Sequence, residues 1–169
     1  MNVRPKHAVL MRRTAMMLSA ALTMGAPAAA LPASDVELRW LPPLETGLVL
    51  LEPFRAPPHE YGPGHRGIDL AADPGAVVRA PAGGTVSFAG TVVDRPVVSV
   101  RVDEHTVYSM EPVTSGLRQG DSVGIGSPIG VVDDGGHCDS RCLHLGVRID
   151  GGYENPMRYF VSRPVLLPW

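Results

Sequence analysis

The sequence predicts an all-β fold, a compact sandwich or barrel of short antiparallel strands. Glycine and proline are frequent, with 19 and 17 among 169 residues, and they recur too closely for a long helix to fit between them. No segment keeps the apolar period of an amphipathic helix. Short runs rich in β-branched residues follow one another at regular spacing instead, which is typical of all-β domains.

The expected strands are short and lie between glycine- or proline-rich turns. The first is an apolar run inside a proline-rich segment, and the last shows strict alternation of apolar and polar residues. We expect strands at Leu48–Leu51, Val77–Arg79, Thr85–Ala89, Val97–Val102, Thr106–Tyr108, Ile129–Val132 and Leu143–Ile149.

Two extended segments carry polar side chains on one face. In "CLHLGVRI", Cys142, His144 and Arg148 share a face, while the leucines and the valine between them point to the core. In "HRGIDL", the neighbouring glycines and proline disfavour a helix, so His65 and Asp69 also share one face of an extended segment. The sequence therefore predicts two strands whose polar faces offer metal-ligating groups.

The first 30 residues have the pattern of a secretory signal peptide. A basic head precedes the apolar run "AMMLSAALTM", and Ala28-Ala29-Ala30 fits a small-residue cleavage site. A retained membrane anchor is the alternative, although the run is shorter than the roughly 20 residues of a spanning helix. We expect residues 1–30 as a signal peptide, 31–58 as a proline-rich lead-in, 59–162 as the β domain and 163–169 as a tail.

The predicted mature chain is acidic. Without residues 1–30, eleven basic and seventeen acidic residues remain, a formal charge of −6. Such a charge disfavours nucleic acid or anionic lipid as the main partner. We therefore expect a bacterial protein that is secreted or held in the cell envelope, without a nucleic-acid partner and without a stable membrane span after cleavage.

Three interpretations are open for the two cysteines, Cys138 and Cys142. In an exported protein they form a disulfide if residues 139–141 turn, because an extended chain would hold them too far apart. Alternatively, Cys142 is a fourth zinc ligand that closes a structural site. The third interpretation is a free thiol beside an active site.

His65, Asp69 and His144 match the ligand set of a catalytic zinc site. Such sites take three protein nitrogen or oxygen ligands and keep a fourth position open. Neutral imidazole and carboxylate groups suit zinc, and strands hold their side chains in defined directions. A His-Asp pair at this spacing is common on protein surfaces, so the pattern alone is a weak signal.

Three ordered motifs resemble the lysostaphin-type zinc endopeptidases, also called LytM-domain proteins. They are "GPGHRGIDLAADPGAVVRAPAGGTVSFAG", "GDSVGIGSPIGVV" and "CLHLGVRIDG", followed by the similar closing segment "YENPMRYF". The resemblance covers roughly residues 57–160. It implies a duplicated hybrid β motif, a groove for peptidoglycan stem or cross-bridge peptides, and zinc held by His65, Asp69 and His144.

The chain departs from this family at two catalytic histidines. Cys142 stands where active members carry the first histidine of an His-x-His strand, and Met110 or a neighbour stands where a histidine follows a tyrosine. Glu111, His105 and Cys142 are the candidates to replace them. His137, in the loop "DDGGHCDS", is interpreted as ordinary surface.

These features lead to two main hypotheses and a third. The first is an exported zinc metalloendopeptidase acting on peptidoglycan peptides. The second is an inactive module of the same fold that binds wall peptides or a cell-wall hydrolase, which the missing histidines favour. The third is a structural β domain in which zinc only supports folding.

Overall fold

The computed structural model describes residues 40–59, 61–139 and 141–160. All of them belong to one compact unit, Glu37–Trp169. The expected signal peptide and the expected tail lie outside the described residues. Within the described part of the chain, no helix is both long and apolar enough to span a membrane.

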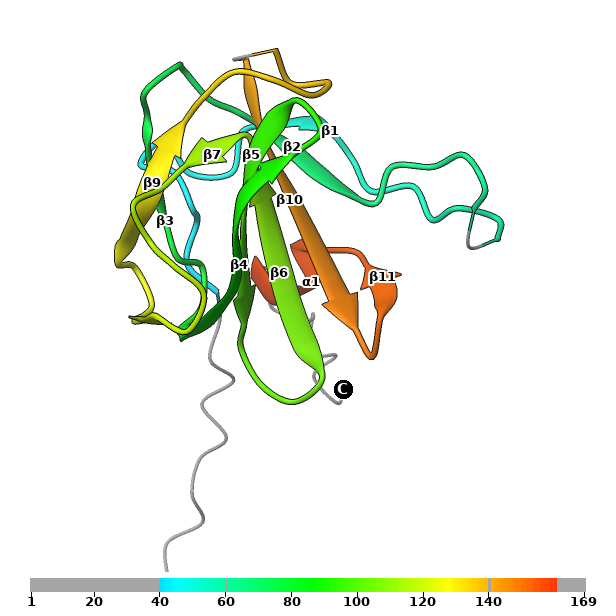
Figure 1. The fold of residues 1–169 in the computed structure, drawn as a ribbon. Coiled ribbons are helices and arrows are strands. Elements are labelled where there is room, and N and C mark those ends of the chain that lie inside the picture. Colours follow the sequence, from blue (N-terminus) through cyan, green and yellow to red (C-terminus); the bar gives the residue numbers. More distant parts are fainter. Residues whose placement is uncertain (1–39, 60, 140, 161–169) are drawn as a thin grey trace, which may run out of the picture. The chain divides into compact units, whose positions relative to one another are not determined.

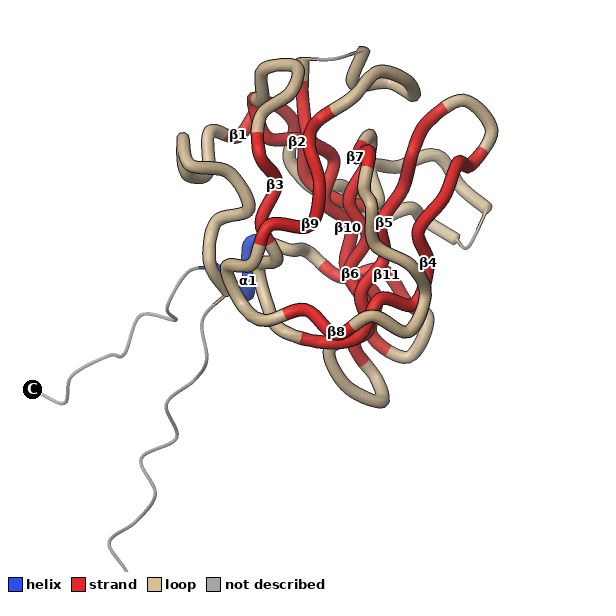
Figure 2. Tube along the Cα trace, turned by 60° about the vertical axis from the view of Figure 1, so that its left-hand side comes forward, coloured by secondary structure: helices blue, strands red, loops and turns tan. Residues whose placement is uncertain are grey.

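The described residues are almost entirely strand and loop, as predicted (Figure 2). The strands are β1 (Leu50–Glu52), β2 (Gly67–Ala71), β3 (Val77–Arg79), β4 (Gly84–Val92), β5 (Arg95–Arg101), β6 (Thr106–Glu111), β7 (Val113–Thr114), β8 (Ser122–Val123), β9 (Pro128–Val132), β10 (Cys142–Ile149) and β11 (Gly152–Glu154). The one helix of the described part of the chain, α1, spans Met157–Phe160.

The strands form two antiparallel sheets (Figure 1). The larger has the order β1-β2-β10-β6-β5-β4-β8, with β11 paired to β10, and the smaller has the order β3-β9-β7. Strand β10 lies between β2 and β6, although these three segments are far apart in sequence. This placement brings the predicted ligands of β2 and β10 onto neighbouring strands.

The hydrophobic core lies on one face of the larger sheet. Along β10, Leu143, Leu145 and Val147 are fully buried, so the alternation read from the sequence is confirmed. They cluster with residues of the smaller sheet such as Val78 and Ile129. The opposite face of β10 is left to its polar residues, and this face carries the site.

The proline-rich segment before residue 59 contributes to this fold. Trp40 and Leu44 belong to the core cluster, and β1 pairs antiparallel with β2. The sequence placed this strand at Leu48–Leu51, and the structure places it at Leu50–Glu52. Residues 40–58 therefore pack on the domain as part of its structure.

Helix α1 was not predicted, because it is too short to show a period. Its start has a local cause: the Asn155 side chain accepts a hydrogen bond from the Met157 backbone N–H at 3.0 Å, and Pro156 suits a first helical position. The helix brings Tyr159 and Phe160 against Trp40. The closing "NP" segment thus anchors the C-terminal end of the described domain to its N-terminal end.

Candidate metal centre

Three adjacent strands place an acid, an imidazole and a second acid in one row. His144 of β10 pairs with Asp69 of β2 on one side and with Glu111 of β6 on the other. Directly opposed residues in an antiparallel sheet project from the same face. The row Asp69–His144–Glu111 therefore lies across the polar face of the larger sheet.

His65 joins this row from the segment just before β2. Its backbone exchanges hydrogen bonds with Arg55, Arg55 N–H to His65 O at 3.0 Å and His65 N–H to Arg55 O at 2.9 Å. Its ring Nδ1 donates to the Pro53 carbonyl at 2.9 Å. Because a carbonyl only accepts, Nδ1 carries the proton and Nε2 of the neutral ring presents a lone pair.

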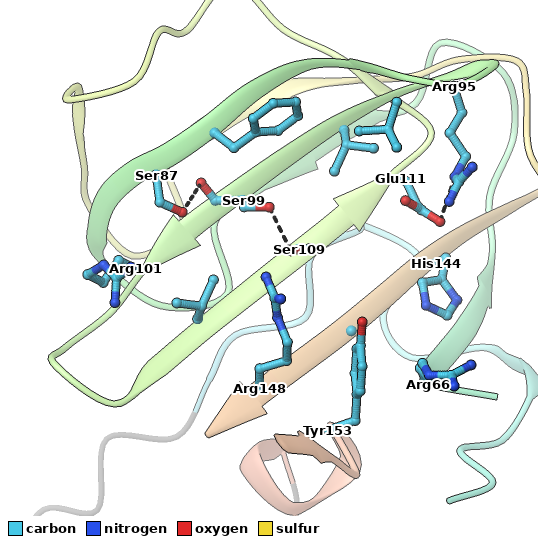
Figure 3. Close-up of a pocket in the computed structure, with 15 residues that line it drawn as sticks. Arg66, Ser87, Arg95, Ser99, Arg101, Ser109, Glu111, His144, Arg148 and Tyr153 are labelled. Atoms are coloured by element: carbon cyan, nitrogen blue, oxygen red, sulfur yellow. Dashed lines mark hydrogen bonds and ion pairs between the residues drawn. The ribbon is translucent and has the colours of Figure 1, made fainter. Parts of the chain in front are cut away.

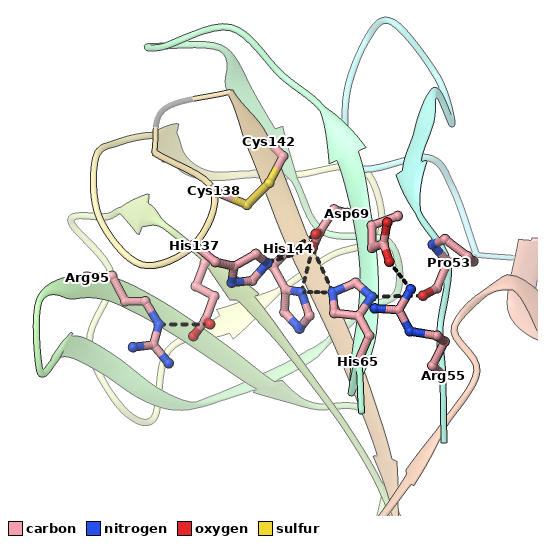
Figure 4. A network of polar contacts seen from close by, with 11 residues as sticks. Pro53, Arg55, His65, Asp69, Arg95, His137, Cys138, Cys142 and His144 are labelled. Carbon is pink, nitrogen blue, oxygen red and sulfur yellow. Dashed lines mark hydrogen bonds and ion pairs between the residues drawn. A yellow bond between two sulfur atoms is a disulfide. The ribbon is translucent and has the colours of Figure 1, made fainter. Parts of the chain in front are cut away.

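The ligating atoms of His65, Asp69 and His144 converge (Figure 4). His65 Nε2 lies 3.1 Å from Asp69 Oδ1 and 3.2 Å from His144 Nδ1. His144 Nδ1 lies 2.7 Å from Asp69 Oδ1. The structure thus brings together the three residues that the sequence grouped from segments 75 residues apart.

This trio fits a zinc ion. Ligand atoms of a tetrahedral site with bonds near 2.0–2.1 Å lie about 3.3 Å apart, close to the separations of 2.7–3.2 Å in the trio. The His144 ring packs so closely on the backbone of Gly67 that only glycine fits there, since a Cβ on Gly67 would lie 2.6 Å from His144 Nε2. Two imidazoles and a carboxylate are also the ligand types that zinc accepts.

The Asp69 carboxyl is ionised in this arrangement. Burial, the largest single influence, acts to raise its pKa, but hydrogen bonds and charge from His144 and His137 outweigh it and lower the pKa to about 2. The side chain is only 7% exposed. A carboxylate ligand must be deprotonated to bind a metal, so Asp69 is ready to do so at neutral pH.

His137 also reaches this cluster, a position that its loop sequence does not predict. Its Nε2 lies 3.1 Å from both Asp69 Oδ1 and Asp69 Oδ2, and it belongs with His65, Asp69 and His144 to a group that could hold a metal ion. Its side chain is 51% exposed, unlike those of the other three. The interpretation of His137 as ordinary surface is therefore wrong.

Two anchors hold the loop that carries His137. On one side Cys138 and Cys142 form a disulfide. On the other side Gly135 and Gly136 press against the β4–β5 turn, where added Cβ atoms would lie 2.3 Å from Asp94 O and 2.5 Å from Arg95 Cδ. Both glycines also have positive φ, a conformation that few other residues adopt.

The disulfide decides between the three interpretations of Cys142. Both cysteines are buried, and the described residues hold no free cysteine. A zinc-ligand or catalytic role for Cys142 requires a thiolate, which the disulfide removes. Those two predictions are therefore wrong, and the disulfide interpretation is the one that the structure shows.

The two remaining catalytic candidates, His105 and Glu111, lie at different distances from the candidate metal centre. His105 immediately precedes Thr106, the first residue of β6, which pairs with Ile149 at the end of β10. Its Nδ1 lies 2.6 Å from Asp150 Oδ1. Glu111 lies five residues from the start of β6, about 17 Å along the strand. This separation contradicts the catalytic role expected for His105, whereas Glu111 stands beside His144.

Strand β6 explains why Glu111, and not Met110, faces the site. Tyr108 and Met110 are fully buried in the core, and Tyr108 donates a hydrogen bond to the Ala82 carbonyl at 3.0 Å. Ser109 and Glu111 therefore point to the other face. There Glu111 Oε1 lies 2.8 Å from Arg95 Nε in an ion pair.

Comparison with known proteins agrees with this fold and its motifs. Residues 63–156 match peptidase family M23. An uncharacterized protein of Mycobacterium tuberculosis is 34% identical over 164 residues. The match covers 94% of this chain and 64% of that relative, so the chain spans less than two thirds of the relative's length.

Solved structures share the fold at low sequence identity. The catalytic domain of the prophage-encoded M23 protein EnpA from Enterococcus faecalis has a TM-score of 0.60 and 24% identity, covering 71% of this chain and 97% of that chain. The antimicrobial peptidase lysostaphin from Staphylococcus simulans has a TM-score of 0.61 and 17% identity, covering 72% of this chain and 54% of that chain. At these identities the likeness is one of fold.

Proposed function

The chain belongs to peptidase family M23, and from this premise we propose that it is an exported zinc endopeptidase that hydrolyses peptide bonds of bacterial peptidoglycan. One observation carries the proposal: His65 Nε2, Asp69 Oδ1 and His144 Nδ1 lie within 3.2 Å of one another. Zinc held by these three residues would supply the Lewis acidity that peptide hydrolysis requires.

The surrounding residues prepare this trio. The Pro53 carbonyl fixes the His65 tautomer, so that Nε2 faces the cluster. The backbone of His144 pairs with both β2 and β6, and its ring packs against the Gly67 backbone. Because these contacts hold the ligand side chains in fixed directions, the trio is preorganised, which is what a precise site needs.

Glu111 and His137 are the residues placed to assist the reaction. Glu111 stands beside His144 on β6, where its carboxylate can accept a proton. His137 approaches the same cluster from the disulfide loop, beside the Asp69 carboxylate. They provide a carboxylate and an imidazole where the two family histidines are absent, and such groups typically contribute about 10²–10⁴-fold to a rate.

Metal content tests the site directly. We expect stoichiometric zinc in the purified wild-type protein and its loss in a His144→Ala variant. His105→Ala is the matched control, because it removes an exposed imidazole that pairs with Asp150 at the far end of β6. Equal zinc in the wild type and the His144→Ala variant would defeat the ligand assignment.

Release of muropeptides from purified peptidoglycan tests the activity. We expect release by the zinc-loaded protein and none by an Asp69→Ala variant. The rival function is a binding module, which the buried Met110 and the disulfide-bonded Cys142 favour, because neither replaces a proton-transferring histidine. A zinc-loaded protein that binds peptidoglycan without releasing muropeptides would establish the rival.

A further inference from the structure

A groove of about 650 Å³ extends from the metal centre over the polar face of the larger sheet. His144 and Glu111 lie at one part of it, and Arg148 lies further along the same face of β10 (Figure 3). A row of serine side chains from β4, β5 and β6 forms the floor between them: Ser87, Ser99 and Ser109. The Ser99 and Ser109 hydroxyls are 2.6 Å apart.

The groove is cationic although the chain carries a formal charge of −2. Four arginines line it, namely Arg66, Arg95, Arg101 and Arg148. The one acid in its lining, Glu111, is already ion-paired with Arg95. The local charge thus opposes that of the whole chain and concentrates anions in the groove.

Arg148 is the best-placed of these cations to receive an anion. It is half-buried. Among the described residues, no carboxylate oxygen lies within 4.0 Å of its guanidinium nitrogens. Strand pairing sets Tyr153 of β11 opposite it, with its guanidinium carbon 5.9 Å from the ring centroid. A cation–π contact of this kind restrains a guanidinium and leaves its N–H edge for bidentate binding.

Arg66 extends this wall toward the metal centre. Its guanidinium carbon lies 5.6 Å from the centroid of the same Tyr153 ring, and it immediately follows His65 in the chain. The side chains of Arg66, Tyr153 and Arg148, in this spatial order, therefore form one continuous side of the groove. A ligand lying along this side would meet the candidate metal centre and the Arg148 guanidinium together.

We propose that the groove selects peptides bearing a free carboxylate, and that Arg148 binds this carboxylate. The inference rests on the proposed function, because it specifies which peptidoglycan peptides the site accepts. His144 and Arg148 are four residues apart on β10, roughly 13 Å, so the carboxylate lies within about four extended residues of the reacting bond. Stem peptides, which carry acidic residues, fit this groove, and uncharged glycine cross-bridges do not.

Binding of matched peptides tests the proposal. The probes are the fluorescently labelled stem peptide L-alanyl-γ-D-glutamyl-meso-diaminopimelyl-D-alanine and the same peptide with its carboxylates amidated. Fluorescence polarisation with the zinc-loaded full chain is expected to show roughly tenfold or greater preference for the free acid, the scale of one charge-assisted hydrogen bond. Arg148→Gln is expected to remove this preference.

Arg79→Gln is the matched control, because Arg79 lies on β3 in the smaller sheet and pairs with Glu45. This variant should keep the preference of the wild type. Equal binding of both peptides by the wild type, or an undiminished preference in Arg148→Gln, would overturn the proposal. Zinc content and muropeptide release are measured separately, so a carboxylate preference without hydrolysis would refute the proposed function and leave this inference standing.

Discussion

At the scale of single residues, Glu111 is the side chain whose position most directly suggests a role in the reaction. It opposes His144 across the β6–β10 pair but does not belong to the converging ligand trio. We expect Glu111→Gln to keep stoichiometric zinc and to lower kcat by about 10²–10⁴-fold, because the amide cannot accept a proton. Zinc content and muropeptide release measure the two effects, and an unchanged kcat would exclude the role.

His137 makes a second prediction at this scale. Its Nε2 contacts both oxygens of Asp69, whereas His65 and His144 also contact each other. We therefore expect His137→Gln to retain zinc and to reduce kcat at least tenfold, since the imidazole near the site is lost. Loss of zinc in this variant would instead make His137 a ligand and contradict the three-residue set.

The residues that the sequence grouped and the structure brings together share one property. His65, Asp69 and His144 lie on or beside strands with clear two-residue alternation, so their side-chain directions follow from local pattern. Their convergence then follows once β2 and β10 pair. Glu111 could be named from the sequence only because it follows Met110 in the chain. The sequence does not show that Tyr108 and Met110 both enter the core, which is what directs Glu111 to the opposite face and the site.

At the scale of elements, the loop between β9 and β10 is where prediction from the sequence failed. The segment around His137 has no periodicity, and its position depends on contacts with Arg95 and on the disulfide, which are not local. The one available signal was the adjacency of His137 to Cys138, whose partner Cys142 begins the ligand strand. Strands β7 and β8 are two residues long, too short to show a pattern.

The disulfide of this loop carries the next prediction. The bonded cysteines are four residues apart, and closing so small a loop stabilises a protein by about 2 kcal/mol in the chain-entropy account. We expect the Cys138→Ser, Cys142→Ser double variant to lose roughly this amount in urea unfolding. Its kcat should fall toward that of His137→Gln, because the loop then keeps only its glycine contacts with the β4–β5 turn.

Combining these changes separates loop positioning from general damage. If the disulfide acts on the reaction through His137, adding His137→Gln to the double serine variant should cause little further loss of kcat. Full additivity of the two losses would show that the disulfide acts on the site by another route.

At the scale of the whole domain, the two faces of the larger sheet divide stability from function. The core face buries Leu143, Leu145 and Val147, and the other face holds the candidate metal centre and the groove. Trp40 lies on the core side, 7% exposed, with its ring centroid 5.3 Å from Tyr108. A change on the core side is therefore expected to affect folding without changing the ligand geometry.

Trp40→Ala tests this division. Its ring also stacks on Tyr159, with centroids 4.3 Å apart, so truncation should cost about 3–5 kcal/mol of unfolding free energy, the range for large aromatic residues in cores. The matched control is Leu41→Ala, because Leu41 is 46% exposed and a surface change typically alters the unfolding free energy by no more than about 0.5 kcal/mol.

The zinc affinity of Trp40→Ala, measured by competition with a chelator where the variant remains folded, should equal that of the wild type. A weaker zinc affinity in the folded Trp40→Ala protein would show that the core face and the metal centre are coupled through β10, against the division proposed here.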